Sequence, residues 1–523
     1  MHFSSELISR NCSVALYFLL LLLKTSGFRR GGTKRKSSRS KRWSRSAQTI
    51  FASWAVLGQL GAVGVLVGEV FEPQLAKADI TDIPGSGSGG GAAGTSTGTG
   101  AFAIGQDATT GTALFAIALG NSANASGGYS QASGYQANAS GGYSQASGSQ
   151  ANAIGTYSQA LGVEATASAK YSQALGYQAS ALAENSQASG YNAQASGNSA
   201  QASGTEASAL GNYSQASGYE ALAAGLNSIA TGTDATAAGN SSIAIGTNAN
   251  AAGNYSQALG YEAKAVGYAS KASGYQANAA AYSTASGYKA KASGVSSQAT
   301  GTNAVAIGDF SQASGDGANA SGNYSQASGT GATASGEYSQ ASGYEANASD
   351  FASQASGYRA QASGNSSQAS GYEANAAGDY SQASGTRSLA SGEYSTASGF
   401  RANAIGNYSQ ASGYQANASG NYSQASGYQA SASGNYSQAS GYNANAIGAY
   451  SQALGVGAIA AGNYSQAFGY NASALGENSQ ASGTIAQASG NYAQALGYEA
   501  SALGDNSQAS GTRSLASGEY STA

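Results

Sequence analysis

Serine, tyrosine and a few carboxylates are the residues of this chain whose side chains could do chemistry. A hydroxyl beside a carboxylate can serve acyl or proton transfer when one group stands out as the nucleophile and another as its base. Here these residues recur at fixed spacing, as in Gly-Asn-Tyr-Ser-Gln-Ala-Ser at 420–426. No pair stands out from the repeat as a general acid and base. We therefore expect a protein that is not an enzyme and that binds no cofactor.

Cysteine and histidine, the usual thiol, imidazole and zinc-binding residues, are almost missing. Cys12 is the one cysteine and His2 the one histidine of the 523 residues, and both precede the repeats. The repeats are thus expected to hold no disulfide, thiolate, imidazole base or ordinary zinc site. Gly87-Ser-Gly89 matches part of a phosphate loop, but it has no apolar strand before it and no helix after it. Asn-Tyr-Ser, as at 212–214, fits a glycosylation acceptor pattern and is also the consensus of the repeat.

The elements that carry these residues are set by a heptapeptide, Gly-x-x-Ser/Ala-x-Ala-x, which runs from about residue 120 to the end. Alternate heptapeptides differ, so the true unit has about fourteen residues. A coiled coil would need large apolar residues at two positions per heptad. Instead the recurrent apolar residue is alanine, and a glycine in a helix costs about 1 kcal/mol relative to alanine. We therefore reject a helix and expect a short strand and a glycine turn in each heptapeptide.

The strand hypothesis predicts which side chains face inward. Strand side chains alternate, so Ser423 and Ala425 would face inward, and Gln424 and Ser426 outward. Glycine at each corner would supply the backbone freedom of a tight turn. Both prolines precede the repeats, which fits a ladder that needs every amide donor.

These features predict an all-β fold, a parallel β-solenoid with coils of about fourteen residues and two short strands per coil. Roughly twenty-eight coils at ~4.8 Å per step would give a rod about 130 Å long. Stability would come mainly from ladders between neighbouring coils, because alanine buries little area. Stacked columns are expected for tyrosine at 408, 422 and 436, and for glutamine at 410, 424 and 438. A disordered, silk-like chain would not need such strict periodicity.

The repeat register breaks at a few places. Gly105 to Gly120 spans one residue too many, and the unit at 280–286 is one residue short. The glycine that opens a heptapeptide is replaced at three positions, by Ala169, Ala183 and Asp350. We interpret the register breaks as local bulges or bends.

The charge is uneven along the chain. Residues 1–78 hold twelve of the 21 Lys and Arg and three of the 24 Asp and Glu, which leaves a formal charge of −12 on the remainder. This mildly acidic remainder argues against nucleic-acid binding, which needs a basic footprint. Glu, Gln, Lys and Arg exchange freely at one position, as in Tyr372-Glu373 and Tyr358-Arg359, so this position is expected to be exposed.

The first hundred residues divide into a leader and a linker. We interpret 1–78 as a long signal peptide with a basic segment, an apolar stretch at 50–67 and a cleavage pattern at Ala76-Lys77-Ala78. The alternative for 50–67 is a retained membrane-spanning helix. Residues 79–100, rich in Gly, Ser and Thr, read as a flexible linker, and 101–523 as the repeats.

Three units carry a more apolar version of the repeat: 102–105 (Phe-Ala-Ile-Gly), 242–246 (Ser-Ile-Ala-Ile-Gly) and 304–308 (Ala-Val-Ala-Ile-Gly). They resemble the Ser-Val-Ala-Ile-Gly motif of the YadA-like head domain of trimeric autotransporter adhesins. The fourteen-residue period, the paired Ala-x-Ala strands and the corner glycines resemble this family as well, over roughly 98–523.

The resemblance implies a left-handed parallel β-roll and a homotrimer, exported to the bacterial cell surface or outer membrane. It also implies attachment to host extracellular matrix or to a cell-surface receptor. The alternative function is a structural, ice-binding or biofilm-matrix solenoid without a specific receptor. The sequence stops within a unit and has neither a heptad stalk nor a membrane anchor, so we expect membrane contact only through a C-terminal anchor that is missing here.

In that family the valine and isoleucine of the motif pack between the three chains. Carried over, this makes the following residues candidates for a trimer interface: Ile243, Ile245, Val305, Ile307, Leu161, Leu175, Leu259, Leu454 and Phe468. Most units depart from the family pattern, because they place Gln and Ser where Val and Ile would be. The expected interface is therefore largely polar, with glutamine ladders between a few apolar units.

Overall fold

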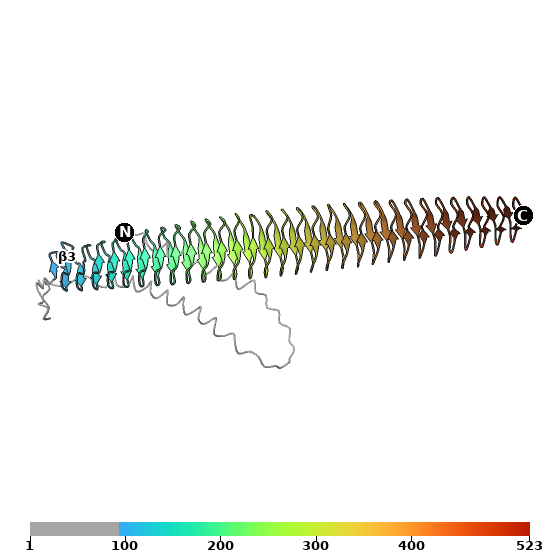
Figure 1. Ribbon diagram of the computed structural model, residues 1–523. Coiled ribbons are helices and arrows are strands. Elements are labelled where there is room, and N and C mark those ends of the chain that lie inside the picture. Colours follow the sequence, from blue (N-terminus) through green and yellow to red (C-terminus); the bar gives the residue numbers. More distant parts are fainter. Residues whose placement is uncertain (1–93) are drawn as a thin grey trace, which may run out of the picture. The chain divides into compact units, whose positions relative to one another are not determined.

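Residues 94–523, the part of the chain described by the computed structural model, form a parallel β-solenoid (Figure 1). Each coil has one three-residue strand and one two-residue strand, such as β47 (Gln424–Ser426) and β48 (Ser431–Ala432). The leader expected at 1–78 lies outside the described residues. Within the described part there is no helix long and apolar enough to cross a membrane.

The strands form two sheets that run the length of the solenoid. Sheet B contains β2 (Phe102–Ile104), β4 (Ile117–Leu119) and then every odd-numbered strand, at intervals of fourteen residues from β5 (Gln131–Ser133) to β25 (Lys271–Ser273) and again from β27 (Thr284–Ser286) to β59 (Gln508–Ser510). Sheet A contains β1 (Thr95–Ser96), β3 (Thr109–Gly111) and then every even-numbered strand, at the same interval from β6 (Asn138–Ala139) to β26 (Asn278–Ala279) and from β28 (Lys291–Ala292) to β60 (Leu515–Ala516).

The ladder places each residue beside its counterpart in the next coil. In β47 and β49 (Gln438–Ser440), Gln424 pairs with Gln438 and Ala425 with Ala439, and all the pairings are parallel. This confirms the predicted all-β parallel β-solenoid with fourteen-residue coils and two strands per coil. The ladder begins at β1, inside the range 79–100 that reads as a linker in the sequence, so the fold shows no boundary at residue 101.

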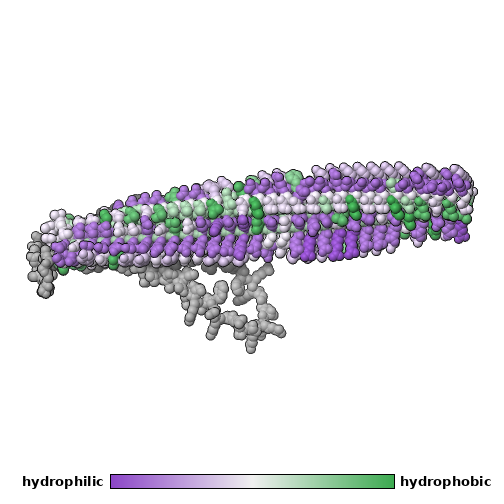
Figure 2. All heavy atoms as spheres, viewed as in Figure 1, coloured by the Kyte–Doolittle hydropathy of each residue, from purple (hydrophilic) through white to green (hydrophobic). Residues whose placement is uncertain are grey.

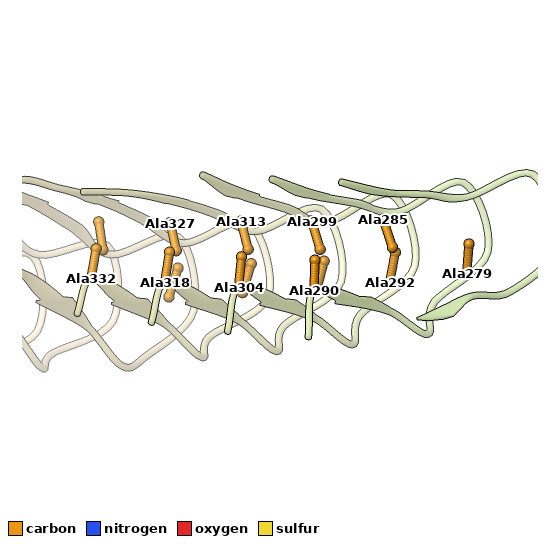
Figure 3. Close-up of a cluster of buried hydrophobic side chains, with 14 of the residues drawn as sticks. Ala279, Ala285, Ala290, Ala292, Ala299, Ala304, Ala313, Ala318, Ala327 and Ala332 are labelled. Carbon is orange, nitrogen blue, oxygen red and sulfur yellow. The ribbon is translucent and has the colours of Figure 1, made fainter. Parts of the chain in front are cut away.

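The core is a thin double layer of very small side chains. Ala285, Ala299 and Ala313 of sheet B point toward alanines on the opposite side of the coil, such as Ala292 and Ala304 (Figure 3). The largest fully buried side chain among the described residues is Thr110; the others are serine and alanine. Such a core contributes little hydrophobic free energy per coil, so the inter-coil hydrogen bonds and stacked side chains must contribute much of the stability.

The alternation predicted for the strands is confirmed. Ser423 and Ala425 are fully buried, whereas Gln424 and Ser426 are exposed. The hydroxyl of Ser423 has no hydrogen-bond partner, although other serines of this column do have one, as Ser228 donates to the Gly225 carbonyl (2.7 Å).

Two corners close each coil, and their glycines differ. Corner 1 is the four residues before a sheet B strand (420–423), and corner 2 the four before a sheet A strand (427–430). Gly427, first in corner 2, has a φ of 132°, which only glycine adopts readily. A Cβ there would also lie 2.5 Å from the Gly441 carbonyl oxygen. This position is glycine in every coil from Gly120 to Gly511.

Corner 1 constrains its first residue through close contact alone, because a Cβ at Gly420 would meet the Gly434 carbonyl oxygen even more closely. Gly420 does not have a positive φ, and other residues occupy the same position at Ala169, Ala183 and Asp350. The left-handed conformation falls instead on the third residue of each corner, which is rarely glycine, such as Tyr422 (φ 59°). The backbone N–H of Tyr422 donates to the Asn407 carbonyl of the preceding coil (2.8 Å), so the ladder holds this conformation in place.

Both breaks in the repeat register lie in corner 1. Thr110 and Ala116 are six positions apart, where most coils have five, and Ala279 and Ser283 are four apart. The strands on either side stay paired, as Ile104 with Leu119 and Lys271 with Thr284. The breaks are thus local, as expected, and they change the length of a corner without interrupting a strand.

Candidate assembly interface

Face B, the outward surface of sheet B, is built from two columns, the one containing Gln424 and the one containing Ser426. Neighbouring glutamines lie above one another, and Gln438 donates a side-chain hydrogen bond to Gln424 (2.9 Å). Gln480 donates in the same way to Gln466 (3.0 Å). Within residues 94–523, Lys271 is the one charged residue of these two columns. Face B is therefore a flat, polar and almost uncharged surface.

Large apolar side chains interrupt the polar columns of face B in patches. They occupy neighbouring coils, so that Ile245 pairs with Leu259, and Leu454 with Phe468. The largest internal patch surrounds β21 (Ile243–Ile245), because Ile229 of the preceding coil pairs with Ile243. The patches of face B are Phe102, Ile104, Ile117 and Leu119; Leu161 and Leu175; Ile229, Ile243, Ile245 and Leu259; and Leu454 and Phe468. Leu496 is a single large residue of this face, between Ser482 and Ser510.

The nine interface candidates from the sequence do not share one face. Seven of them lie on face B: Ile243, Ile245, Leu161, Leu175, Leu259, Leu454 and Phe468. The other two do not: Val305 lies in β30 (Val305–Ala306) of sheet A, and Ile307 follows this strand. Since the two sheets turn opposite surfaces to the outside, Ile243 and Val305 cannot enter the same flat interface.

Face A, the outward surface of sheet A, carries an apolar column that the sequence reasoning missed. The column is the position directly after each two-residue strand, and Ile307, 49% exposed, belongs to it. Figure 2 shows one side of the rod, on which hydrophobic residues interrupt rows of hydrophilic residues. Counting in steps of fourteen from Ile307 would have revealed this column in the sequence.

The corners form two edges lined by exposed aromatic rings. Tyr408 stacks on Tyr422 with centroids 4.8 Å apart, and at the other edge Tyr414 stacks on Tyr428 at 4.7 Å. The tyrosine column expected at 408, 422 and 436 is confirmed. The rings cover one another's faces, so the ladders present ring edges and hydroxyl groups to the solvent.

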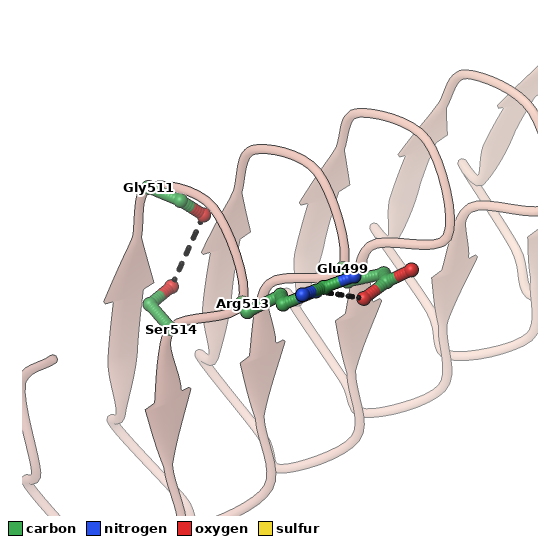
Figure 4. Close-up of polar contacts among 4 residues, drawn as sticks. All are labelled: Glu499, Gly511, Arg513 and Ser514. Atoms are coloured by element: carbon green, nitrogen blue, oxygen red, sulfur yellow. Dashed lines mark hydrogen bonds and ion pairs between the residues drawn. The ribbon is translucent and has the colours of Figure 1, made fainter.

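The third residue of corner 2 forms a column of charged and amide side chains. Arg359 contacts Glu345 (2.6 Å), and this hydrogen bond, with a second from Tyr344, holds the pKa of Glu345 below its ordinary value. Hydrogen bonding to Glu345 raises the pKa of Tyr344. Arg513 contacts Glu499 in the same way (2.8 Å; Figure 4). The column is exposed, as the free exchange of charge sign predicted.

The chemistry open to these surfaces is limited. Across residues 94–523 no group of three or more His, Cys, Asp or Glu side chains is placed to hold a metal ion. The Asn-Tyr-Ser pattern is used for folding, because the side chain of Asn212 accepts a hydrogen bond from the Asn198 backbone (2.9 Å) and Ser214 is buried. What the arrangement offers is extended, repetitive contact.

A family model described as YadA head domain repeat (2 copies) matches segments that together cover about half of the chain. The matched residues are 153–179, 167–193, 188–214, 216–242, 237–263, 299–325, 376–402, 390–409, 425–451, 439–465, 467–484, 474–500, 488–509 and 495–521. The chain belongs to the YadA head domain repeat family. No curated protein sequence matches the chain significantly.

Membership of the YadA head family agrees with the geometry. Each matched segment of about two coils contains both kinds of strand and both corners, so the model describes the same structural unit as the ladder. The YadA head family implies a trimer and a surface-exposed adhesin, and it is typically non-catalytic.

Proposed function

We propose that this chain is the head of an exported trimeric surface adhesin, in which three copies pack with face B inward. The observation that carries the proposal is the arrangement of large apolar side chains on face B within a chain of YadA head repeats. The adjacent coils that contain Ile245 and Leu259 form a compact apolar patch, and patches of this kind recur along the rod.

The patches supply energy that the polar columns do not. Burying a half-exposed isoleucine or leucine contributes about 1 kcal/mol. Ile229, Ile243, Ile245 and Leu259 from three chains would therefore contribute on the order of 10 kcal/mol before the entropic cost of association. The glutamine and serine columns between the patches are nearly uncharged, so they add no repulsion between chains.

The edges stay outside in this arrangement and would meet the host surface. Their tyrosine ladders are rigid and amphipathic, which suits contact at low entropic cost. Because the same coil recurs along the rod, a receptor of the extracellular matrix or of a host cell would meet many equivalent weak contacts. Three rods side by side multiply them, and binding would then rest on avidity.

The mass of the full chain in solution tests the assembly. At concentrations too low for heads to associate with one another, we expect light scattering to give three times the chain mass of 51.1 kDa. The double variant Ile243→Ser, Ile245→Ser should weaken the trimer. The matched variant Val305→Ser, Ile307→Ser, on the opposite face, should leave it intact. A trimer that is lost only in the second variant would place face A inward and overturn the proposal.

Binding to an immobilised extracellular-matrix preparation tests the adhesive role. The trimer should bind at least about a hundred times more tightly than the variant in which Ile243 and Ile245 are replaced, because a monomer offers one third of the repeated contacts and the avidity falls. A stable trimer that binds neither matrix nor host cells would indicate a purely structural rod.

A further inference from the structure

The apolar column of face A has a spacing of its own. We call its nine large residues the face A ridge; each is between 41% and 51% exposed. They are Ile154, Leu182, Leu210, Val266, Ile307, Ile405, Ile447, Leu475 and Leu503. No two of them occupy neighbouring coils. Every one has serine or alanine at the same position of the coil before it and the coil after it, as Leu475 lies between Ala461 and Ser489.

This spacing is the opposite of that on face B. There all the large residues except Leu496 have a large neighbour in the next coil and form patches, such as Leu454 with Phe468. Within the column of the face A ridge they stand singly, with a gap of at least one small residue on each side. The second outward column of face A holds five more large residues, which also stand singly within that column: Leu222, Val305, Leu389, Ile459 and Leu515. A surface that alternates large and small residues fits a partner surface with the same alternation, because each large side chain enters a gap of the other.

The partner must match the coil spacing over the whole ridge. Ile154 and Leu503 are twenty-five coils apart, or about 120 Å at ~4.8 Å per step. A globular protein cannot offer gaps at this interval over such a length, whereas a second copy of this chain has the same rise and twist. The two outward columns of face A carry Lys264 and Lys291 as their charged residues within the described range, so like charge does not keep two copies apart.

We propose that two rods pair through face A in antiparallel orientation, with each ridge filling the gaps of the other. A two-fold axis that runs across the rod keeps a column opposite itself, whereas an axis along the rod would move the column to the other side of the face. Such a pair is isologous and closed, so it does not grow into a filament.

One register of this pair places all nine large residues of the ridge against small residues. When the axis passes through Ser321, that residue faces its own copy and all nine large residues face serine or alanine. The pairs are Ile154 with Ser489, Leu182 with Ala461, Leu210 with Ser433, Val266 with Ala377, Ile307 with Ser335, Ile405 with Ala238, Ile447 with Ser196, Leu475 with Ser168 and Leu503 with Ser140. A shift by one coil brings large residues into opposition, as Ile154 with Leu475 in one direction and with Leu503 in the other.

This pairing goes beyond the proposed adhesin and uses another surface. Face A and face B are on opposite sides of each coil, so three chains that pack through face B leave their ridges on the outside. Rods that project from facing surfaces meet in antiparallel orientation. The pair would then join one head to another head, without a receptor.

A single cysteine on the axis tests the register. In the full chain with Cys12→Ser, we expect Ser321→Cys to form a disulfide-linked dimer under mild oxidation, because the two thiols face each other. Thr330→Cys, on the exposed edge of the same coil, should give none. Ser314→Cys lies on face B, so disulfide formation there reports on the trimer and not on the pair. A failure of the trimer is therefore seen separately from a failure of the pair. Absence of a Ser321→Cys dimer at concentrations where the rods associate would overturn the proposal.

Filling the gaps separates interdigitation from general stickiness. The variant Ala461→Leu, Ser489→Leu makes face A more apolar and blocks the gaps opposite Leu182 and Ile154. We expect at least a tenfold weaker pair by sedimentation, together with loss of the Ser321→Cys dimer. Equal or stronger association of this variant would show that the ridge does not interdigitate.

Discussion

The ring of Tyr436 lies 4.8 Å from the ring of Tyr422, and the two ring planes differ by 1°. The two residues are fourteen positions apart, and the contact repeats without a gap along seven coils. The ladder is Tyr380, Tyr394, Tyr408, Tyr422, Tyr436, Tyr450 and Tyr464. The ladder joins coils at their outer edge, where the alanine core has no contact to offer.

The tyrosine ladder predicts a stability difference between two identical substitutions. Tyr422→Ser removes two stacked contacts, which are worth about 0.5–1.5 kcal/mol each. Tyr213→Ser should cost much less, because its column neighbours are Ser199 and Asn227, while its φ of 59° is the same as that of Tyr422. Hydrogen exchange of the coils around each site measures the two effects. Equal losses of stability would mean that tyrosine stabilises the coil through its left-handed backbone conformation and not through stacking.

The two corner glycines predict different responses to alanine. Gly427→Ala forces a φ near 132°, which costs about 1–3 kcal/mol, in addition to the close contact with the next coil. Gly420→Ala also brings a Cβ against the next coil, and more closely. It should nevertheless cost less, because Gly420 has no positive φ and Ala169 and Ala183 already occupy this position. Urea unfolding of the two variants compares them. The order would be reversed if steric contact alone decided the cost.

The buried serine column predicts a substitution without cost. The Ser423 hydroxyl is buried and has no hydrogen-bond partner, so Ser423→Ala should leave stability unchanged or raise it by about 1 kcal/mol. Ala200 and Ala493 already stand in this column. Ser228→Ala is the control, because it removes the bond to the Gly225 carbonyl and should cost about 1 kcal/mol. Thermal unfolding of both variants measures the two effects. A lower unfolding temperature of Ser423→Ala would contradict the prediction.

The glutamate–arginine column predicts a loss of stability in acid. The fold lowers the pKa of Glu345 and Glu373, chiefly through hydrogen bonds from Arg359 and Arg387. Their contribution is complete above the ordinary glutamate pKa of about 4.3 and is lost as the pH falls through the lowered values. Unfolding curves between neutral pH and about pH 3 should show this decline. It should be smaller in Glu345→Gln, Glu373→Gln and at high salt, because the pairs are exposed.

Much of the fold could be predicted from the repeat, because the alternation of small residues and the regular glycines exclude a helix and favour a parallel β-solenoid. The assignment of the apolar residues could not be read from the motif alone. Ser-Ile-Ala-Ile-Gly at 242–246 and Ala-Val-Ala-Ile-Gly at 304–308 look alike, yet they lie half a coil apart in phase and therefore in opposite sheets. A seven-residue view cannot separate them, because both halves of the coil bury alternate small residues.

The two corners also differ in the backbone conformation of their first glycine, which composition does not show. Glycine opens both corners, but the positive φ at Gly427 and its absence at Gly420 show two separate requirements. Among the replaced glycines, Ala169, Ala183 and Asp350 all fall in corner 1, which was the available signal. This signal becomes visible only when the sequence is divided into fourteen-residue coils, because that division assigns each glycine to its corner.

The length changes at Thr110 to Ala116 and at Ala279 to Ser283 make corner 1 a natural place for engineering. A coil can gain or lose a residue there while both ladders continue. Short peptides grafted at this corner would be displayed at intervals of about 4.8 Å, or any multiple of it, along a rigid ruler. The rod could then serve as a spacing gauge for receptors that respond to the distance between their ligands.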